Sequence, residues 1–495
     1  MVYPALFMQS SLPLGLASLS AALKKDGIDV KIFDTAFYRK GDEIDENIER
    51  ADVHHSVKRV DYKAVEAYVN ESDPFEDFKS LLFDYKPNIV GISAVESSFE
   101  NSINYTRLAK MLLNVKTIAG GVFPTLSPEI AIKEDSIDIV CVGEGESALL
   151  ELCNCLSCGA DYSRIKSLWV KIEGKVIKNE MMPLEHLDSF PNPDFSCFSK
   201  GMFYKPMQGK LFKTVPIEHT RGCPYNCTFC SEPMLNTIHK NEGKMYYRRK
   251  SASKVVEEME NNIKMYSPEL FYFTSETFLA MSEEVFNEFI ENYKKVSIPF
   301  WIQTRIETVT LDKLRKLQEV GLYWMTIGIE HGNEEFRRKI LKRHTTNKQI
   351  IEVMNILAEC EQGVSINNII GLPFETKELI YDTIMLNREL FKTNNRIRCN
   401  ISTFTPFRGS ELYDLCVSND LFDPLPYISN TNISNSLLIN DSFTKEQFEG
   451  LYRTFPLYVY LPDEYLDRIR MAEKLTPEGN CEYEALNEKV KDYIE

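Results

Sequence analysis

Three cysteines stand close together near the middle of the chain, in the stretch TRGCPYNCTFC, at Cys223, Cys227 and Cys230. They follow a strand-like run at 214–219, so the three thiols share one compact loop at the end of a strand. Three thiolates can hold three irons of a 4Fe-4S cube and leave the fourth iron open to a substrate or cofactor. Zinc is the alternative, but zinc usually needs a fourth ligand, and no second C-x2-C pair lies within the usual distance.

Polar or glycine-containing stretches end several strand-like runs farther along the chain. At the carboxyl ends of barrel strands, such side chains can point at a ligand while the strand bodies stay apolar. The stretches are FTSETF (273–278), WIQTRIE (301–307), GIEHGNEEF (328–336), IIGLPFET (369–376) and FTPFRGSELY (404–413).

The cysteine loop and these stretches, taken together over about 216–413, resemble the radical S-adenosylmethionine (SAM) enzymes. The resemblance implies that a 4Fe-4S cluster on the three cysteines chelates SAM, and that one electron from a flavodoxin- or ferredoxin-type donor cleaves it to a 5′-deoxyadenosyl radical. By the same match, the residues expected to contact SAM are Phe229, Ser275, Glu276, Gln303, Arg305 and Glu330. Ser275 departs from the pattern, since relatives often carry Asp there.

His331 is the one candidate catalytic side chain, and relatives often carry Ser at its position. A histidine beside the SAM pocket could relay a proton or steer the substrate, whereas most such residues only satisfy local hydrogen bonds. Both interpretations stay open at this point.

The first part of the chain carries glycines directly after strand-like runs. The segments LPLGLASLSAAL (12–23), IAGGVFPTLSPE (118–129) and DIVCVGEGE (138–146) resemble the cobalamin-binding domain that precedes the barrel in one large group of radical SAM enzymes. Glycine at a strand end lets the backbone approach a ligand. The resemblance implies that cobalamin is contacted by Gly120, Gly121, Thr125, Gly143, Glu144, Gly145 and Glu146. The alternative is a flavodoxin-like domain without a ligand.

No lower axial histidine for cobalt is evident. The D-x-H sequence at 52–54 has Val57 where the D-x-H-x-x-G motif requires glycine. It lies in a region with acidic blocks at 42–49 and 71–77, which we expect to be a solvated insertion. The cysteines at 153, 155 and 158 are not expected to hold a second cluster, because their side chains would point in different directions at a helix end.

Composition narrows the function classes. The 495 residues carry 73 acidic and 57 basic side chains, a formal charge of −16 at pH 7, which opposes binding to nucleic acid or anionic membranes. Apolar runs are too short to span a bilayer, and the start lacks a signal peptide pattern, so we expect a cytoplasmic protein whose 12 cysteines are mostly reduced.

Short apolar runs alternating with helical patterns predict an α/β protein with parallel sheets. In the first block strands are expected at 29–33, 88–93, 115–119 and 137–142, and in the second at 214–219, 270–274, 300–304, 323–329, 365–370 and 398–405. A weak hairpin pattern at 168–178 precedes several prolines. Residues 1–3 leave little room for the central first strand, so we expect the native start to lie upstream.

These patterns predict four parts. They are a flavodoxin/Rossmann-like cobalamin-binding domain at 1–165, a linker at 166–213, a partial (β/α)6 TIM-type radical SAM barrel at 214–420, and a small, mainly α-helical region at 421–495. The last part is expected to cover the barrel mouth, although its aromatic residues, such as Tyr452, suit a core equally well.

The resemblance implies methylation of an unactivated carbon of an unknown small-molecule, lipid or natural-product substrate. The alternatives are a cobalamin-dependent radical cyclisation or rearrangement without methyl transfer, and a non-catalytic cobalamin or redox sensor. A methylthiotransferase is disfavoured, because the cysteines at 141, 153, 155 and 158 do not fall in the separate strand-end loops that its extra cluster needs.

Overall fold

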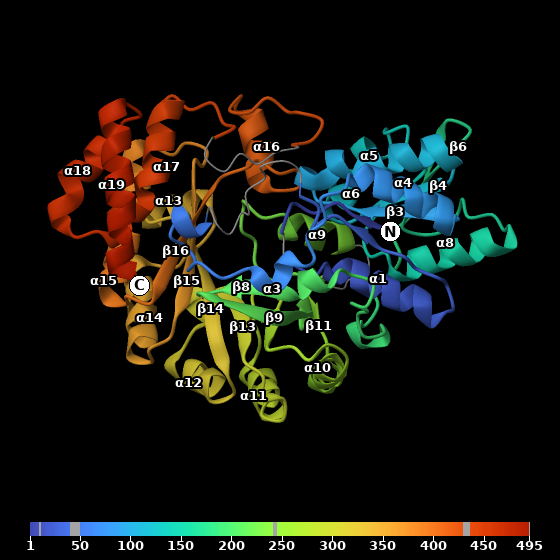
Figure 1. The fold of residues 1–495 in the computed structure, drawn as a ribbon, viewed down its shortest axis with the longest axis horizontal. Helices are drawn as coiled ribbons and strands as arrows, with labels where there is room; N and C mark the ends of the chain where they lie inside the picture. The colour runs from blue at the N-terminus through green and yellow to red at the C-terminus, as the bar shows by residue number, and fades with distance from the viewer. Residues whose placement is uncertain (9–10, 40–49, 241–244, 429–435, 495) are drawn as a thin grey trace.

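The computed structural model describes residues 1–8, 11–39, 50–240, 245–428 and 436–494. Two sheets, each with its own helices, lie side by side, and a helical C-terminal region packs beside the second sheet (Figure 1). The acidic block at 42–49 and most of the Asn- and Ser-rich loop near 429–440 lie outside the described residues.

The first sheet of the described chain has seven strands in the order β2-β1-β3-β4-β5-β6-β7. Strands β1 to β5 are parallel and follow the flavodoxin-like order that the sequence predicts. The central strand β1 is short, as expected. The bounds are β1 Val2–Tyr3, β2 Phe33–Asp34, β3 Ile89–Ser93, β4 Lys116–Gly120 and β5 Ile139–Cys141.

Helices cover both faces of this first sheet. On one face, α1 (Leu14–Lys25) packs on α8 (Glu146–Cys158) in a cluster that includes Leu23, Leu152 and Ile139. On the other face, α4 (Pro74–Tyr85) and α5 (Glu96–Leu113) enclose Phe99 and Val140. The shorter helices of this region are α3 (Lys63–Glu66), α6 (Val122–Leu126) and α7 (Pro128–Ala131). Burial on both faces explains why the strands read as continuous apolar runs.

The segment expected to be a linker contributes strands to both sheets. The hairpin β6 (Leu168–Ile172) and β7 (Lys175–Lys178) extends the first sheet antiparallel to β5. Strand β8 (Tyr204–Met207) pairs antiparallel with β9 of the second sheet. Buried Leu168 and Val170 join the first core, so apolar burial outweighs the nearby prolines. The expectation of a simple connector at 166–213 was wrong in this respect.

The second sheet is an open half-barrel, in the described order β16-β15-β14-β13-β12-β9-β8. Strand β9 and strands β12 to β16 are parallel, which confirms the partial (β/α)6 architecture. They start and end within a few residues of the sequence expectation. Their bounds are β9 Lys210–Ile217, β12 Leu270–Phe273, β13 Phe300–Arg305, β14 Leu322–Glu330, β15 Val364–Ile370 and β16 Ile397–Thr403.

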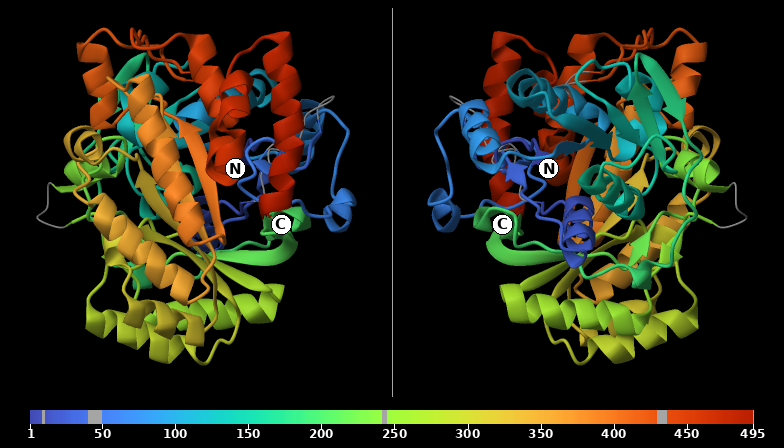
Figure 2. Two further views of the ribbon diagram at one scale, coloured as in Figure 1. Left: turned by 90° about the vertical axis from the view of Figure 1, so that its left-hand side faces the viewer. Right: turned by 90° about the vertical axis from the view of Figure 1, so that its right-hand side faces the viewer.

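Helices lie on the outer side of the curved sheet (Figure 2). They are α10 (Ala252–Tyr266), α11 (Glu283–Tyr293), α12 (Leu311–Glu319), α14 (Asn347–Glu359) and α15 (Lys377–Thr393), with α13 (Glu334–Ile340) at the strand ends. The strands alternate accordingly. Phe271, Ile327 and Ile366 pack outward against the helices, whereas Asn367 and Asn400 of neighbouring strands face a cavity.

The C-terminal region is helical, as expected, with α16 (Glu411–Ser418), α17 (Lys445–Tyr460), α18 (Leu466–Ala472) and α19 (Pro477–Ile494). Helix α17 begins at a capping box made by Thr444 and Gln447. Helix α19 returns to the N-terminal region, where Asn487 Nδ2 donates to the carbonyl of Asp52 at 2.8 Å. The segment around Asp52 is therefore packed against the end of the chain.

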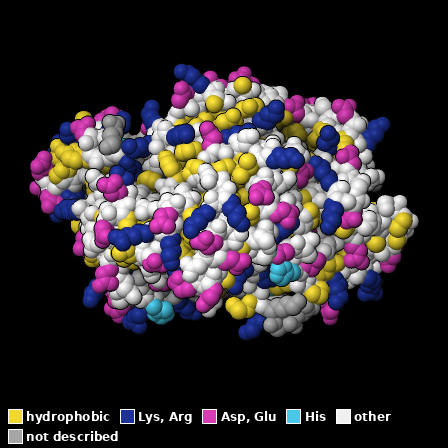
Figure 3. Space-filling view, turned by 90° about the horizontal axis from the view of Figure 1, so that it is seen from below, with side chains coloured by type: hydrophobic (Ala, Val, Ile, Leu, Met, Phe, Trp, Pro, Cys, Tyr) yellow, Lys and Arg dark blue, Asp and Glu magenta, His cyan; other side chains and the backbone are white. Residues whose placement is uncertain are grey.

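The surface matches the acidic composition. On the face in Figure 3, lysine and arginine side chains alternate with aspartate and glutamate, without a continuous basic stripe. Among the described helices, we find no candidate that could cross a bilayer.

Candidate functional site

The cysteine loop lies between the short antiparallel strands β10 (Thr220–Arg221) and β11 (Arg248–Arg249), and leads into α9 (Glu232–His239). Gly222 has a φ of +87°, and a Cβ there would lie 2.8 Å from the Tyr246 ring. Thr228 fixes the far side of the loop, since its hydroxyl donates to the Ile340 carbonyl at 2.6 Å. The loop is thus anchored on both sides of the half-barrel mouth.

The three thiols differ in their surroundings. Arg305 Nη1 lies 3.0 Å from the sulfur of buried Cys227, and the Cys223 sulfur lies 3.7 Å from the Thr277 hydroxyl. Burial raises the pKa of Cys223, and raises that of Cys230 to about 12. Among the described residues, no group of three His, Cys, Asp or Glu side chains is arranged so that it could hold a metal ion. The donor set, three thiols on one loop facing Arg305, is the set that a cluster with one open iron requires.

Four of the SAM candidates lie around this loop. Arg305 stacks its guanidinium 3.9 Å from the Tyr225 ring centre. Gln303 is on the same face of β13, two residues earlier. Glu276 follows β12, where burial raises its pKa. Phe229 of the loop lines the cavity at the barrel mouth.

Glu330 closes the strand β14 in an unusual backbone conformation, with a φ of +72°. Its carboxylate is buried and lies 3.2 Å from Arg343 Nη1. A Cβ at Gly328 would lie 2.0 Å from Glu330 Oε1, so a side chain there would displace the Glu330 carboxylate. Burial raises the pKa of Glu330, and Arg343 and Arg305 oppose that rise.

Neither of the two cavities described below is lined by Gln303, Arg305, Ser275 or His331. The last two have local partners. Ser275 is fully buried, and its hydroxyl accepts from the Thr220 backbone N–H at 3.3 Å. His331 is also fully buried. Its Nδ1 accepts from the Asn333 N–H at 3.0 Å, so its Nε2 donates to Glu375 Oε1, also at 3.0 Å. The structure therefore gives both residues local bonding partners, and does not bring His331 to a ligand position.

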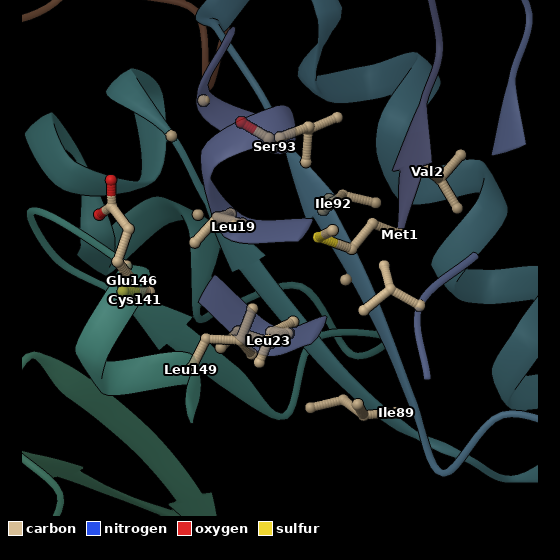
Figure 4. Close-up of a pocket in the computed structure, with 18 of the residues that line it drawn as sticks. Met1, Val2, Leu19, Leu23, Ile89, Ile92, Ser93, Cys141, Glu146 and Leu149 are labelled. Carbon is tan, nitrogen blue, oxygen red and sulfur yellow. The ribbon is translucent and has the colours of Figure 1, made fainter. Parts of the chain in front are cut away.

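A cavity of about 530 Å³ lies between the first sheet and the half-barrel, and we call it the interdomain cavity. Its inner part is apolar, and Leu19, Leu23 and Ile92 point into it, with Glu146 at its edge (Figure 4). All seven predicted cobalamin contacts line it: Gly120, Gly121, Thr125, Gly143, Glu144, Gly145 and Glu146. The residues predicted from the sequence thus share one cavity, and their contact with cobalamin stays a prediction.

Thr125 holds the two glycine loops together. Its hydroxyl donates to the Gly121 carbonyl at 2.8 Å and accepts from the Gly143 N–H at 3.0 Å. Gly121 has a φ of +98°, and a Cβ there would lie 2.8 Å from the Ala94 backbone. Side chains are thus kept out of the strand ends, and the space stays open.

The opposite wall of the interdomain cavity belongs to the half-barrel. Of its residues, Glu276 was predicted from the sequence, whereas Arg221, His239 and Tyr246 were not. Arg221 stands two residues before the first cluster cysteine. It pairs with Glu144 at 3.1 Å, with Glu146 at 3.0 Å and with Glu218 at 3.0 Å. Arg248 also pairs with Glu144. Arg221 stands in the motif TRGC, next to the predicted cysteine loop. Its partners Glu144 and Glu146 lie about 75 residues earlier in the chain, and no local sequence pattern connects them with Arg221.

His239 and Tyr246 complete this wall. Their rings stack with centroids 4.5 Å apart. Burial lowers the pKa of His239 to about 4, so its imidazole is neutral at physiological pH. Because Arg221 precedes the cysteine loop and His239 and Tyr246 follow it, the cavity and the loop share a boundary.

A second cavity, of about 620 Å³, lies at the barrel mouth, and we call it the barrel-mouth cavity. Strands β14 to β16 supply Glu330, Asn367 and Asn400, and the cysteine loop supplies Phe229. Tyr452 of α17 also lines it, so this aromatic residue is both buried and at the mouth.

Comparison with known proteins identifies the same two regions. The B12 binding domain family matches residues 55–153, and the Radical SAM superfamily matches residues 217–386. Among curated proteins, an uncharacterized methyltransferase of Pyrococcus horikoshii is 26% identical over 83% of this chain and 86% of its own length. An anaerobic magnesium-protoporphyrin IX monomethyl ester cyclase of Rubrivivax gelatinosus is 25% identical over 70% of this chain and 62% of its own length.

Solved structures show the same fold. The radical SAM methyltransferase TsrM from Kitasatospora setae superposes with a TM-score of 0.67 at 13% identity, over 99% of this chain and 98% of that chain. The cobalamin-dependent SAM radical enzyme OxsB superposes with a TM-score of 0.66 at 15% identity, over 99% of this chain and 70% of that chain. The chain thus carries a radical SAM domain preceded by a cobalamin-binding domain.

Proposed function

We propose that this protein is a cobalamin-dependent radical SAM methyltransferase that methylates an unactivated carbon of a small substrate. One observation carries the proposal: the cysteine loop lies between two cavities. Glu276, beside the cysteines, lines the interdomain cavity, and Phe229 of the loop lines the barrel-mouth cavity. A methyl donor and a radical source would thus meet one substrate across a short distance, which this chemistry needs.

The cysteines Cys223, Cys227 and Cys230 would hold the cluster, and Arg305 would offer its guanidinium to the SAM carboxylate. When bound, the reduced cluster with SAM supplies a radical that removes a hydrogen atom, and cobalamin supplies a methyl group. Glu330 is kept in place by Arg343, and the Tyr225 ring holds the Arg305 side chain in one orientation. The electron would come from an external flavodoxin- or ferredoxin-type protein.

For cobalamin, the glycine loops on Thr125 would admit the corrin edge, and the apolar inner part of the interdomain cavity suits an aromatic base. The lining residues include one histidine of the described chain, His239, which comes from the half-barrel wall. The first sheet thus offers no imidazole from a D-x-H-x-x-G motif.

The relatives support a methyl transfer and also a second candidate. Besides the Pyrococcus protein, a cytidylyl-2-hydroxyethylphosphonate methyltransferase of Streptomyces wedmorensis is 22% identical over 83% of this chain and 79% of its own length. The match to the ester cyclase favours radical ring formation as the alternative. The product distinguishes them, because methylation adds one CH2 and releases S-adenosylhomocysteine, whereas cyclisation adds no carbon.

The first experiment needs no substrate. Iron, acid-labile sulfide and corrin are quantified on one anaerobically purified sample, and 5′-deoxyadenosine is measured after reduction with SAM present. We expect all three components and SAM cleavage. Zinc in place of iron, or a cluster spectrum unchanged by SAM, would contradict the proposal. Bound cobalamin without any 5′-deoxyadenosine would instead support a sensor.

A further inference from the structure

The barrel-mouth cavity has a wall that is not part of the barrel. Arg50, His54 and Ser56 line it from the N-terminal region. This wall is fixed from outside, because His55 Nε2 lies 2.7 Å from Asn487 Oδ1 of α19. The segment expected to be a solvated insertion therefore closes the open side of the half-barrel.

The strand wall of the cavity carries polar groups, and one of them lacks a hydrogen-bond partner in the described structure. Asn367 and Asn400 are paired in register on β15 and β16. Asn400 Nδ2 donates to Asn367 Oδ1 at 2.9 Å, while Asn400 Oδ1 is buried and has no partner in the described structure. Ser402 follows on the same face of β16 and also lines the cavity. A buried amide oxygen without a partner is costly, and a hydrogen-bonding ligand would satisfy it.

The N-terminal wall carries a cation. Burial, together with nearby Arg50, lowers the pKa of His54 to about 4. Burial raises the pKa of Tyr272, and Arg50 is the charge that opposes this rise most. Tyr272 stacks on Trp301 of β13 with ring centroids 3.9 Å apart. Arg50 itself lines the cavity, and its charge acts on His54 in the cavity wall and on Tyr272 of the sheet.

This positive charge is not balanced within the part of the chain that the structure describes. No carboxylate there forms an ion pair with Arg50. Glu330 is the one acidic side chain among the described lining residues, and it is already paired with Arg343 at 3.2 Å. The cavity thus has a free cation at one end and amide and hydroxyl groups along its strand wall.

We propose that the part of this cavity next to Arg50 binds the substrate as a small polar anion, with its carboxylate or phosphate group on Arg50 and its hydroxyl or amide groups on Asn367, Asn400 and Ser402. Phe229 and Glu330, which also line the cavity, would contact SAM beside the substrate. The inference rests on the proposed function only in taking the bound molecule as the substrate. Charge-assisted hydrogen bonds to a guanidinium give such an anion both affinity and orientation. The polar lining disfavours a lipid.

The test uses three probes with one carbon skeleton: glycerol 3-phosphate, glycerate and glycerol. Their dissociation constants are measured by saturation-transfer NMR on the protein loaded with cluster and cobalamin. We expect one of the anions to bind at least about tenfold more tightly than glycerol, and Arg50→Gln to remove about tenfold of that affinity. The tighter anion identifies the group that Arg50 recognises.

Arg59→Gln is the matched control, since Arg59 lies on the same segment but is exposed and paired with Asp52. It should leave anion binding unchanged. Asn400→Asp is a second variant that places a carboxylate against the anion, so it should weaken anion binding and leave glycerol binding unaltered. Equal binding of anions and glycerol, or equal losses in Arg50→Gln and Arg59→Gln, would overturn the inference.

SAM cleavage is measured on the same samples. Normal cleavage without any preference for anions would overturn this inference alone. Absent cleavage with Arg50-dependent anion binding would overturn the proposed function and leave the anion site standing.

Discussion

The two sheets are built from similar parallel strands but use their faces differently. The first sheet is covered by helices on both faces, with apolar residues such as Val140 inward on each side. The second sheet has helices on its outer face, and its inner face carries Asn367 and Asn400. In the first region the cavity lies at the strand ends, whereas in the second it lies against the sheet itself. We therefore expect a polar residue to lower the stability of the first sheet when it replaces a core residue, and to be tolerated on the inner face of the second sheet.

The largest effect of a substitution should come from the cysteine loop, which lies between the two sheets. Cys227→Ala should abolish SAM cleavage and the iron-dependent absorbance, because two thiols cannot replace three around one cube. Corrin content should be retained, since no cluster cysteine lines the interdomain cavity. Iron, corrin and 5′-deoxyadenosine assays check this. Cys158→Ala, at an exposed cysteine, is the control. Loss of corrin together with iron would show that the two regions do not bind independently.

The next largest effect should come from Arg221, whose ion pairs with Glu144 and Glu146 connect the two regions; we call these pairs the Arg221 bridge. Arg221→Met removes the nearest cation of Glu146 and Glu218 and leaves Glu144 with Arg248, and each of these carboxylate side chains is at most 14% exposed. Removing one partner of such buried pairs costs about 3–5 kcal/mol. We expect a lower free energy of unfolding in denaturant titrations and a loss of bound corrin.

Arg107→Met provides the comparison, because Arg107 pairs with Glu134 at the surface and is 51% exposed. Its effect should be at most about 1 kcal/mol. Equal effects of the two variants would show that the Arg221 bridge does not stabilise the interface.

A pair of variants tests the two faces directly. Val140→Asn should lower the free energy of unfolding by about 3 kcal/mol, through lost apolar burial and an amide without partners. Asn400→Leu should change it by less than about 1 kcal/mol, because the lost bond to Asn367 is offset by added apolar area and by removal of the unpaired Oδ1. Both are measured on the cofactor-free protein. A large loss in Asn400→Leu would mean that the inner face is structural.

The smallest effect concerns acid stability. His219 follows β9, packs against Phe278 with ring centroids 5.3 Å apart, and has a pKa that burial lowers to about 4. In the unfolded chain the pKa of this histidine is about 6.5. On acidification the unfolded state therefore binds a proton before the folded state does, and the free energy of unfolding falls as the pH drops from about 6.5 toward 4. His219→Leu should therefore gain about 2 kcal/mol at pH 5 and little at pH 8.

The measurement is urea unfolding at both pH values, with His186→Leu, at an exposed histidine, as the control. If His219→Leu raises the free energy of unfolding equally at pH 5 and pH 8, the effect comes from packing and not from protonation of the histidine.

The regular elements follow closely from local sequence. The expected strand at 300–304 is β13 (Phe300–Arg305), and that at 365–370 is β15 (Val364–Ile370), because long apolar runs must be buried between other elements. The expectation at 29–33 fits less well, since the edge strand β2 pairs with β1 only at Phe33 and Asp34. Its apolar residue Val30 instead packs against α8 in the core.

The sequence by itself determined the order of the two folds, the loop that carries three neighbouring cysteines, and the glycines at the strand ends that line the interdomain cavity, because each is a property of consecutive residues. Only the tertiary structure decided that Arg221 meets Glu144 and Glu146, that His331 is buried on Glu375, and that Arg50 and Asn400 line one cavity. Those partners are tens to hundreds of residues apart. Their meeting depends on how the helices pack against the sheets, which local periodicity does not encode.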